Sequence, residues 1–437
     1  MVADDQEKAE IALAGMPHML IAEDTTSSDE STTELTNCIF PDPGFKAWLT
    51  VFGAAVMLFC CGQLTAFGVF ETYYAQHQLK GVSPSTISWI GSLQLWILYF
   101  SGSVLGRFFD AYGPRMILIS GSFLLVFSTM ILSVCTRFYQ FLLVQGLLTG
   151  LAYGMLFYPS FASISTHFST LRATAVGIAI AGSGVGGVVF PVLFRYLFAR
   201  IGFGWTVRAS GFLLLALGAI GCVTITSRIP PGRRAISPLP DVKLLTDAPF
   251  VLLVVGCVFV NFGLFIPFTY ISDYAISQGV SSSTSFYIVS AMNGGSIFGR
   301  IIPALVADAI GRFNIASPSA FLIGLFALVF WMLAKTLVNI TVFAVAYGCF
   351  AGAFLAMQIP CVSQISDIKE VGTRIGVLYS VASFGVLAGG PAAGAALKAG
   401  NGNYTGMVVL CGITNILGSL LILLSKYRVN RNLFAHV

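Results

Sequence analysis

The segment Gly106-Arg107-Phe108-Phe109-Asp110-Ala111-Tyr112-Gly113-Pro114-Arg115 separates two long apolar stretches. A shorter copy of its charged pattern, Asp308-x-x-Gly311-Arg312, places an aspartate 198 residues after Asp110 (308 − 110). A fixed offset between similar segments indicates an internal duplication. One charged turn, used twice in an otherwise apolar chain, therefore predicts a duplicated membrane protein.

The composition supports this prediction. Of the 437 residues, 56% are hydrophobic and only 9% are charged, whereas soluble domains carry roughly 25% charged residues. Several windows of about 20 residues are long enough and apolar enough to cross a bilayer as helices. The alternation typical of membrane strands is absent. We expect an all-α integral membrane protein with the lipid bilayer as its surroundings.

Twelve spanning helices can be drawn, with ends uncertain by about four residues. They are expected at 47–70, 84–107, 114–135, 138–165, 173–198, 205–227, 249–273, 285–307, 315–335, 338–362, 374–397 and 404–425. A basic, proline-rich segment divides them into two halves. The predicted organisation is a disordered acidic cytoplasmic tail (1–44), an N-terminal half (45–227), a cytoplasmic linker (228–248), a C-terminal half (249–425) and a cytoplasmic tail (426–437).

The repeat extends beyond the charged turn. At the same offset of 198, Gln63 corresponds to Asn261 and Phe70 to Phe268; at offsets near 200, Pro159 corresponds to Pro360 and Pro191 to Pro391. Six spans return the chain to the side on which it started, so the two halves are parallel, pseudo-symmetric repeats.

Lysine and arginine counts predict the orientation. With a cytoplasmic N-terminus, fifteen basic residues fall inside and seven outside, and Arg300 lies within a span. The positive-inside rule favours this arrangement, with both termini cytoplasmic. We expect the plasma membrane, with the vacuolar membrane as the alternative. The sequons at Asn339 and Asn403 fall outside in this topology, in loops too short to make glycosylation a firm prediction.

These residues resemble the major facilitator superfamily, whose signature loop between helices 2 and 3 is similar to Gly106–Arg115. A resemblance to the monocarboxylate-porter family rests on Pro41–Gly44, Thr166–Phe168, Arg172-Ala173, Gly177–Gly187 and Gly299-Arg300. A resemblance to the fungal branch of that family rests on Phe70–Tyr74, Gly202–Arg208 and Asn293–Arg300. The resemblance implies a twelve-helix carrier of organic acids or metabolites.

The chain departs from the animal members of that family at two positions. Those members carry a lysine in helix 1 and an aspartate one turn before the helix 8 arginine, whereas here helix 1 has no lysine and Ser296 precedes Arg300. Both groups are associated with proton-linked lactate transport. The departures argue against a simple lactate–proton symporter.

Arg300 is the main candidate for substrate binding. A buried arginine inside a span is costly and usually marks a binding site or transport path, and its planar guanidinium suits a carboxylate. The alternative is an arginine that reaches the membrane interface or a helix-end carbonyl. Polar residues expected to line a central cavity with it are Asn293, Gln63, Asn261, Tyr158 and Gln358, although each alone is more often a helix–helix contact.

Two further groups have predicted roles. Charges at the helix ends are expected to act as a conformational latch that holds one face closed: Arg107, Asp110, Arg115, Asp308 and Arg312. Glu71 and Asp273 are the candidates for proton coupling, because no carboxylate lies at the expected midplane.

The sequence thus predicts a secondary transporter of a small organic anion or metabolite that works by alternating access, with proton coupling left open. It predicts a functional monomer without cofactor, metal site or nucleic-acid partner; the nine cysteines form no C-x-x-C pair. The alternatives are a non-transporting nutrient receptor, which would need a larger signalling tail, and a membrane enzyme, for which a catalytic constellation is missing.

Overall fold

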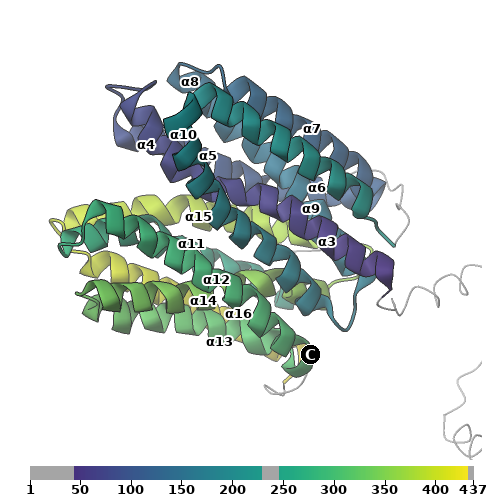
Figure 1. Ribbon diagram of the computed structural model, residues 1–437. Helices are drawn as coiled ribbons and strands as arrows, with labels where there is room; N and C mark the ends of the chain where they lie inside the picture. The colour runs from purple at the N-terminus through teal and green to yellow at the C-terminus, as the bar shows by residue number, and fades with distance from the viewer. Residues whose placement is uncertain (1–43, 229–245, 432–437) are drawn as a thin grey trace, which may run out of the picture. The chain divides into compact units, whose positions relative to one another are not determined.

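The computed structural model describes residues 44–228 and 246–431, all within the compact unit Pro41–Val437. Every regular element in these two ranges is a helix (Figure 1). The predicted acidic tail up to residue 43, most of the predicted linker (229–245) and residues 432–437 lie outside the described residues.

The N-terminal half contains six spans. The first is built from α3 (Phe45–Cys61), η1 (Gly62–Ala66) and α4 (Phe67–Gln76), and the second from α5 (Pro84–Phe100) and α6 (Gly102–Tyr112). The third is α7 (Pro114–Leu132), and the fourth consists of α8 (Phe138–Phe141), η2 (Leu142–Thr149) and α9 (Gly150–His167). The long α10 (Arg172–Thr224) holds the fifth and sixth, which meet at Gly202. The φ angle of 72° there lies in the left-handed region that glycine adopts readily.

The C-terminal half repeats this arrangement with fewer interruptions. Its spans are α11 (Ala248–Ser277), α12 (Ser282–Ile310), α13 (Phe313–Phe326) continued by η4 (Ala327–Trp331), α14 (Leu337–Gln364), α15 (Val371–Ala399) and α16 (Thr405–Val429). In the described ranges ten helices are individually long and apolar enough to cross a membrane. Dividing α10 at Gly202 and adding the α5–α6 pair gives twelve. The predicted fold class is confirmed.

The two charged segments, Gly106–Arg115 and Asp308–Arg312, contain fewer turn residues than the sequence suggested. Residues 106–112 continue helix α6, and the chain turns only at Gly113, with φ 76°. The second copy behaves alike, because α12 passes through Asp308 and ends before Gly311, with φ 102°. Both aspartates therefore sit on the last turns of helices, where rigid backbone fixes their positions.

Glycines let the two halves approach each other. A Cβ atom added to Gly376 of α15 would lie 2.0 Å from the carbonyl oxygen of Gly102 of α6, and one added to Gly106 would lie 2.1 Å from that of Gly372. Between α10 and α12, a Cβ on Gly177 would lie 2.5 Å from the carbonyl oxygen of Arg300. Small residues permit such backbone contact between membrane helices. The halves thus meet along two equivalent pairs, helix 2 with helix 11 and helix 5 with helix 8.

The bundle has two distinct ends. At the end we call the linker end, Thr50 Oγ1 of α3 lies 3.1 Å from Thr226 Oγ1, and Ser425 of α16 donates to the Pro249 carbonyl at 2.7 Å, so the described residues that flank the linker lie beside α3 and α16. The opposite end, here the far end, carries the α4–α5 and α11–α12 turns. Many large apolar side chains face outward between the ends, including Met116, Phe123 and Phe212; such a surface fits lipid.

Candidate functional site

Asp110 and Asp308 each bind the N-terminus of a helix in the opposite half. Asp110 accepts hydrogen bonds from the backbone N–H groups of Gly372 (3.1 Å) and Thr373 (2.7 Å), at the start of α15. Asp308 accepts them from Ala173 (3.0 Å) and Thr174 (2.7 Å), at the start of α10. Free N–H groups and the positive end of the helix dipole favour a carboxylate at this position. These bonds join the halves at the linker end.

The basic residues of the predicted latch are less uniform. Arg312 lies 3.7 Å from Asp308 and donates to the Ser169 carbonyl of the other half at 2.6 Å. Arg107 donates through Nε to the Ser103 carbonyl of its own helix at 2.7 Å. Arg115 is exposed on the first turn of α7. The structure therefore brings Asp110, Asp308 and Arg312 to the contact between the halves and places Arg115 at the surface.

Arg172 is a further residue at this end that the sequence did not single out as a latch. Its buried guanidinium donates to the carbonyls of Phe168 (2.8 Å), Ser165 (3.3 Å) and, across the halves, Ser363 (3.0 Å). A cation on the first turn of a helix is unfavourable, because the helix dipole is positive there. The position of Arg172 at the start of α10 therefore indicated that its side chain would need hydrogen-bond acceptors. Arg172 reinforces the closed linker end.

Arg300 lies deeper, where α12 contacts α10 of the other half. Its Nη1 donates to the Ile180 carbonyl (3.1 Å) and to Ser183 Oγ (2.9 Å). The Nε atom is buried without a hydrogen-bond partner, and Arg300 forms no ion pair within 44–228 and 246–431. A desolvated charge without a counter-charge is costly. The guanidinium therefore has unused capacity to bind an anion.

Other groups near this level also lack partners. Ser296 Oγ, one turn before Arg300, is buried and unbonded, and so are both amide atoms of Gln358. The packing of Gly348 on Met292 and of Gly352 on Ser296 sets the register between α12 and α14 at 56 residues (348 − 292 and 352 − 296). The reciprocal contacts, of Gly295 on Val345 and of Gly299 on Cys349, give an offset of 50 residues (345 − 295 and 349 − 299), so Gln358 lies between the levels of positions 302 and 308, toward the linker end from Arg300. The absence of partners on such buried polar groups calls for a ligand or water.

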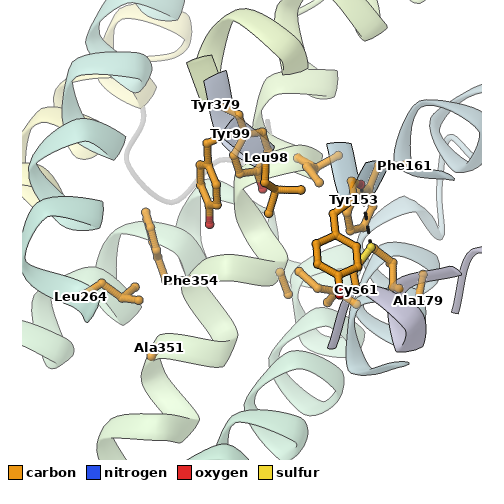
Figure 2. Packing of buried hydrophobic residues seen from close by; sticks show 14 of the residues in the cluster. Cys61, Leu98, Tyr99, Tyr153, Phe161, Ala179, Leu264, Ala351, Phe354 and Tyr379 are labelled. Carbon is orange, nitrogen blue, oxygen red and sulfur yellow. Dashed lines mark hydrogen bonds between the residues drawn. The ribbon is translucent and has the colours of Figure 1, made fainter. Parts of the chain in front are cut away.

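Aromatic rings from both halves contact each other in this region. The Tyr99 ring of α5 and the Tyr379 ring of α15 meet edge to face with centroids 5.2 Å apart, and Figure 2 labels both residues. The Tyr99 phenol interacts electrostatically with Arg300, and sequence reasoning missed this residue. Tyr158 contacts Tyr379 with ring centroids 5.9 Å apart, but its hydroxyl donates to the Tyr99 carbonyl at 2.9 Å. The Tyr158 hydroxyl proton is therefore used in a contact with the backbone of α5.

The remaining predicted ligands lie elsewhere. Gln63 accepts a hydrogen bond from Tyr153 (3.2 Å) and lines a small cavity of about 10 Å³ within the N-terminal half. Asn261 is fully buried and donates to the Cys257 carbonyl of its own helix at 2.8 Å. Asn293, two turns before Arg300 on α12, donates to the Val289 carbonyl at 3.2 Å. Of these predicted ligands, Gln63, Asn261 and Asn293 therefore all make contacts within their own half.

Glu71 and Asp273 lie toward the far end. Glu71 is half-buried and accepts a hydrogen bond from Ser88 Oγ at 2.9 Å, whereas Asp273 is exposed. The two carboxylates belong to opposite halves and are close enough to interact electrostatically. Like charges repel, so each of the two carboxylates disfavours ionisation of the other.

A bundle of two pseudo-symmetric six-helix halves that meet along two helix pairs, with the unpaired Arg300 at one of these contacts, is typical of a membrane carrier. The comparisons agree: residues 47–350 match the Major Facilitator Superfamily, and the chain belongs to this family of membrane transporters. It is therefore a transporter and not an enzyme. The finer assignment to the monocarboxylate-porter family stays a prediction.

Among curated proteins, the chain is 40% identical to MFS-type transporter 1 of an Ophiocordyceps species, over 89% of this chain and 86% of that one. It is 38% identical to the aspyridones efflux protein of Emericella nidulans (82% and 73% covered) and 36% identical to the agnestins efflux protein of Paecilomyces divaricatus (89% and 89%). Among solved structures, the human organic anion transporter MFSD10 superposes with a TM-score of 0.70 at 16% identity, covering 87% of this chain and 100% of that one. At this identity the likeness shows the fold alone.

Proposed function

We propose that this chain exports an aromatic or partly apolar organic acid, of the secondary-metabolite type, by alternating access. The observation that carries the proposal is Arg300, a half-buried arginine at the contact between the halves whose buried Nε is unpartnered and which has no counter-charge among the described residues. A carboxylate or enolate would supply the missing charge and accept two parallel hydrogen bonds. The neighbouring Tyr99 and Tyr379 rings suit an apolar or aromatic body.

Export is favoured over uptake by the relatives, two of which bear the names of efflux proteins for fungal metabolites. In the predicted topology the linker end is cytoplasmic, so the closed linker end corresponds to the state that releases substrate outside. Loading from the cytoplasm then requires the Asp110 and Asp308 contacts to separate. Each helix-capping contact stabilises by about 0.5–2 kcal/mol, which is small enough for a ligand to shift the balance.

Proton coupling is proposed to act through Glu71 and Asp273. Protonation of one carboxylate removes the repulsion between them and allows the far end to close. A proton bound from outside would thus accompany the return of the carrier toward the cytoplasm. We further propose that the chain works as a monomer in the plasma membrane, with both termini cytoplasmic.

The test is flux in proteoliposomes that contain the purified full chain. The panel comprises 2-naphthoate, salicylate, phenylpyruvate and lactate, with 2-naphthamide as the neutral control, with and without a pH gradient. We expect saturable transport of at least one aromatic acid and none of the amide. Arg300→Ala and Arg300→Lys should each reduce transport about tenfold or more, because a bidentate charge-assisted contact is lost.

Arg431→Ala is the matched control, because Arg431 is exposed beyond α16. Normal transport by both Arg300 variants would contradict the binding assignment. Absence of flux for every acid, together with saturable binding, would favour the nutrient-receptor alternative.

A further inference from the structure

The C-terminal half contains a second cavity that the alternating-access mechanism does not use. Its volume is about 480 Å³, and it lies at the far end between the last turns of α11, the loop after η4 and the α15–α16 turn. Cavities of roughly 300–1,000 Å³ hold drug-sized ligands. The lining residues used below are Tyr274, Trp331, Met332, Lys335, Asn403 and Tyr404.

Three side chains that line this cavity offer hydrogen-bond donors: Trp331, Lys335 and Asn403. Trp331 is fully buried, and its indole Nε1–H has no hydrogen-bond partner. Indole nitrogen can only donate, so a buried Nε1–H requires an acceptor. Lys335 adds an ammonium group that forms no ion pair within the described ranges. Asn403 Oδ1 is occupied by Thr405 (2.9 Å to N and 2.7 Å to Oγ1), which leaves its amide hydrogens available.

Hydrogen bonds and ring packing hold the walls of this cavity. The Tyr274 hydroxyl donates to the carbonyls of Trp331 (3.3 Å) and Ala334 (2.9 Å) and so holds the loop that carries Lys335. The Trp331 ring stacks on Phe343, with centroids 5.5 Å apart, and meets the Tyr274 ring edge-on at 5.9 Å. Because the indole and the loop are packed, binding here would order few groups, which favours affinity.

We propose that this cavity is a second binding site for an organic anion, separate from the site at Arg300. The ligand carboxylate would lie between Lys335 and the donors of Trp331 and Asn403, with its apolar body against Tyr404 and Met332. The Lys335 ammonium is the charged group that lines the cavity. Asp273 acts electrostatically on Tyr404 but does not line the cavity. The site belongs to one half only, so it persists whichever way the carrier faces.

The experiment is calorimetric titration of 2-naphthoate and 2-naphthamide into the purified full chain, produced without N-glycans because Asn403 opens a sequon. We expect saturable binding of the acid and binding of the amide about tenfold weaker, since the amide lacks the charge. In the Arg300→Ala background, Lys335→Gln should weaken binding of the acid about five- to tenfold and Trp331→Phe about fivefold. Lys398→Gln, exposed on the last turn of α15, should leave binding unchanged.

The Arg300→Ala variant distinguishes the two sites. Binding that survives Arg300→Ala and falls with Lys335→Gln supports the second site, whatever becomes of transport. In the Arg300→Ala background, which isolates the second site, a Lys335→Gln replacement that leaves the affinity for 2-naphthoate unchanged overturns the proposal; so does an amide that binds there as well as the acid. Displacement of 2-naphthoate by phosphatidylglycerol, but not by salicylate, would reassign the cavity to lipid headgroups. Lys335 lies exposed in a loop, so its replacement does not threaten folding.

Discussion

Ser165 and Ser363, one repeat length of 198 residues apart, face each other with their hydroxyl oxygens 3.2 Å apart. Equivalent positions of two repeats can touch only where the pseudo-two-fold axis passes between them. The axis therefore runs through the linker end, close to the Arg172 bond to the Ser363 carbonyl. The Asp110 and Asp308 contacts fall on opposite sides of it, and their partners Thr373 and Thr174 are 199 residues apart (373 − 174).

This symmetry predicts that the two aspartates contribute similarly. Asp110→Ala and Asp308→Ala should each loosen the closed linker end by about 0.5–2 kcal/mol, the range for lost helix caps. Spin labels at the exposed positions 112 and 369 should report a larger population of long distances in both variants. Asp367→Ala is the control, because its carboxylate accepts a hydrogen bond from nearby Lys369 within the same half. A large shift in one variant alone would contradict the symmetric latch.

The glycine contacts between α6 and α15 should also be necessary for the closed arrangement of the two halves. Gly376→Ala places a methyl group 2.0 Å from the Gly102 carbonyl oxygen. We expect a loss of about 1–3 kcal/mol from the closed arrangement, typical of overpacking, seen as lower thermal stability in detergent. Gly390→Ala on the same helix meets nothing within 4 Å and should have little effect. Equal stability of the two variants would show that the halves separate without strain.

Substitutions at and around Arg300 should reduce substrate affinity by different amounts. Ser183→Ala removes one neutral acceptor for Nη1, so substrate affinity should change by less than about fivefold, as for one ordinary hydrogen bond. Arg300→Lys keeps the charge but loses the planar fork, and should cost about tenfold or more. Concentration-dependent flux in proteoliposomes separates the affinity from the maximal rate. A Ser183→Ala defect as large as that of Arg300→Lys would make Arg300 a purely structural contact.

The carboxylates at the far end lead us to predict that the transport rate depends on external pH. If Glu71 and Asp273 repel each other when ionised, a lower external pH should speed the return step, because protonation removes the repulsion. Glu71→Gln removes that charge permanently, so its transport should be fast and nearly independent of external pH. Asp367→Asn serves as the distant control. A native pH profile in Glu71→Gln would remove Glu71 from the coupling mechanism.

The sequence by itself determined the class of this protein. Low charge and long apolar windows require a helical membrane protein, and the 198-residue offset between Asp110 and Asp308 requires two repeats. Arg300 also stood out, because an isolated charge within an apolar span is costly. Each of these features is local, or is a comparison of one segment with another, and needs no knowledge of packing.

Only the tertiary structure decided which polar residues meet. The capping of α15 by Asp110 joins residues 262 and 263 positions apart, and no spacing rule predicts such a partner. Gln63 and Asn261 correspond in the repeat, yet each is buried inside its own half, because a polar residue in a span can face any of several neighbouring helices. For the same reason, the sequence did not show that Tyr99 interacts with Arg300: the direction in which a residue of a span points depends on the packing of its helix. Rotation about the helix axis and packing against neighbours, which sequence leaves undetermined, set the chemistry between the halves.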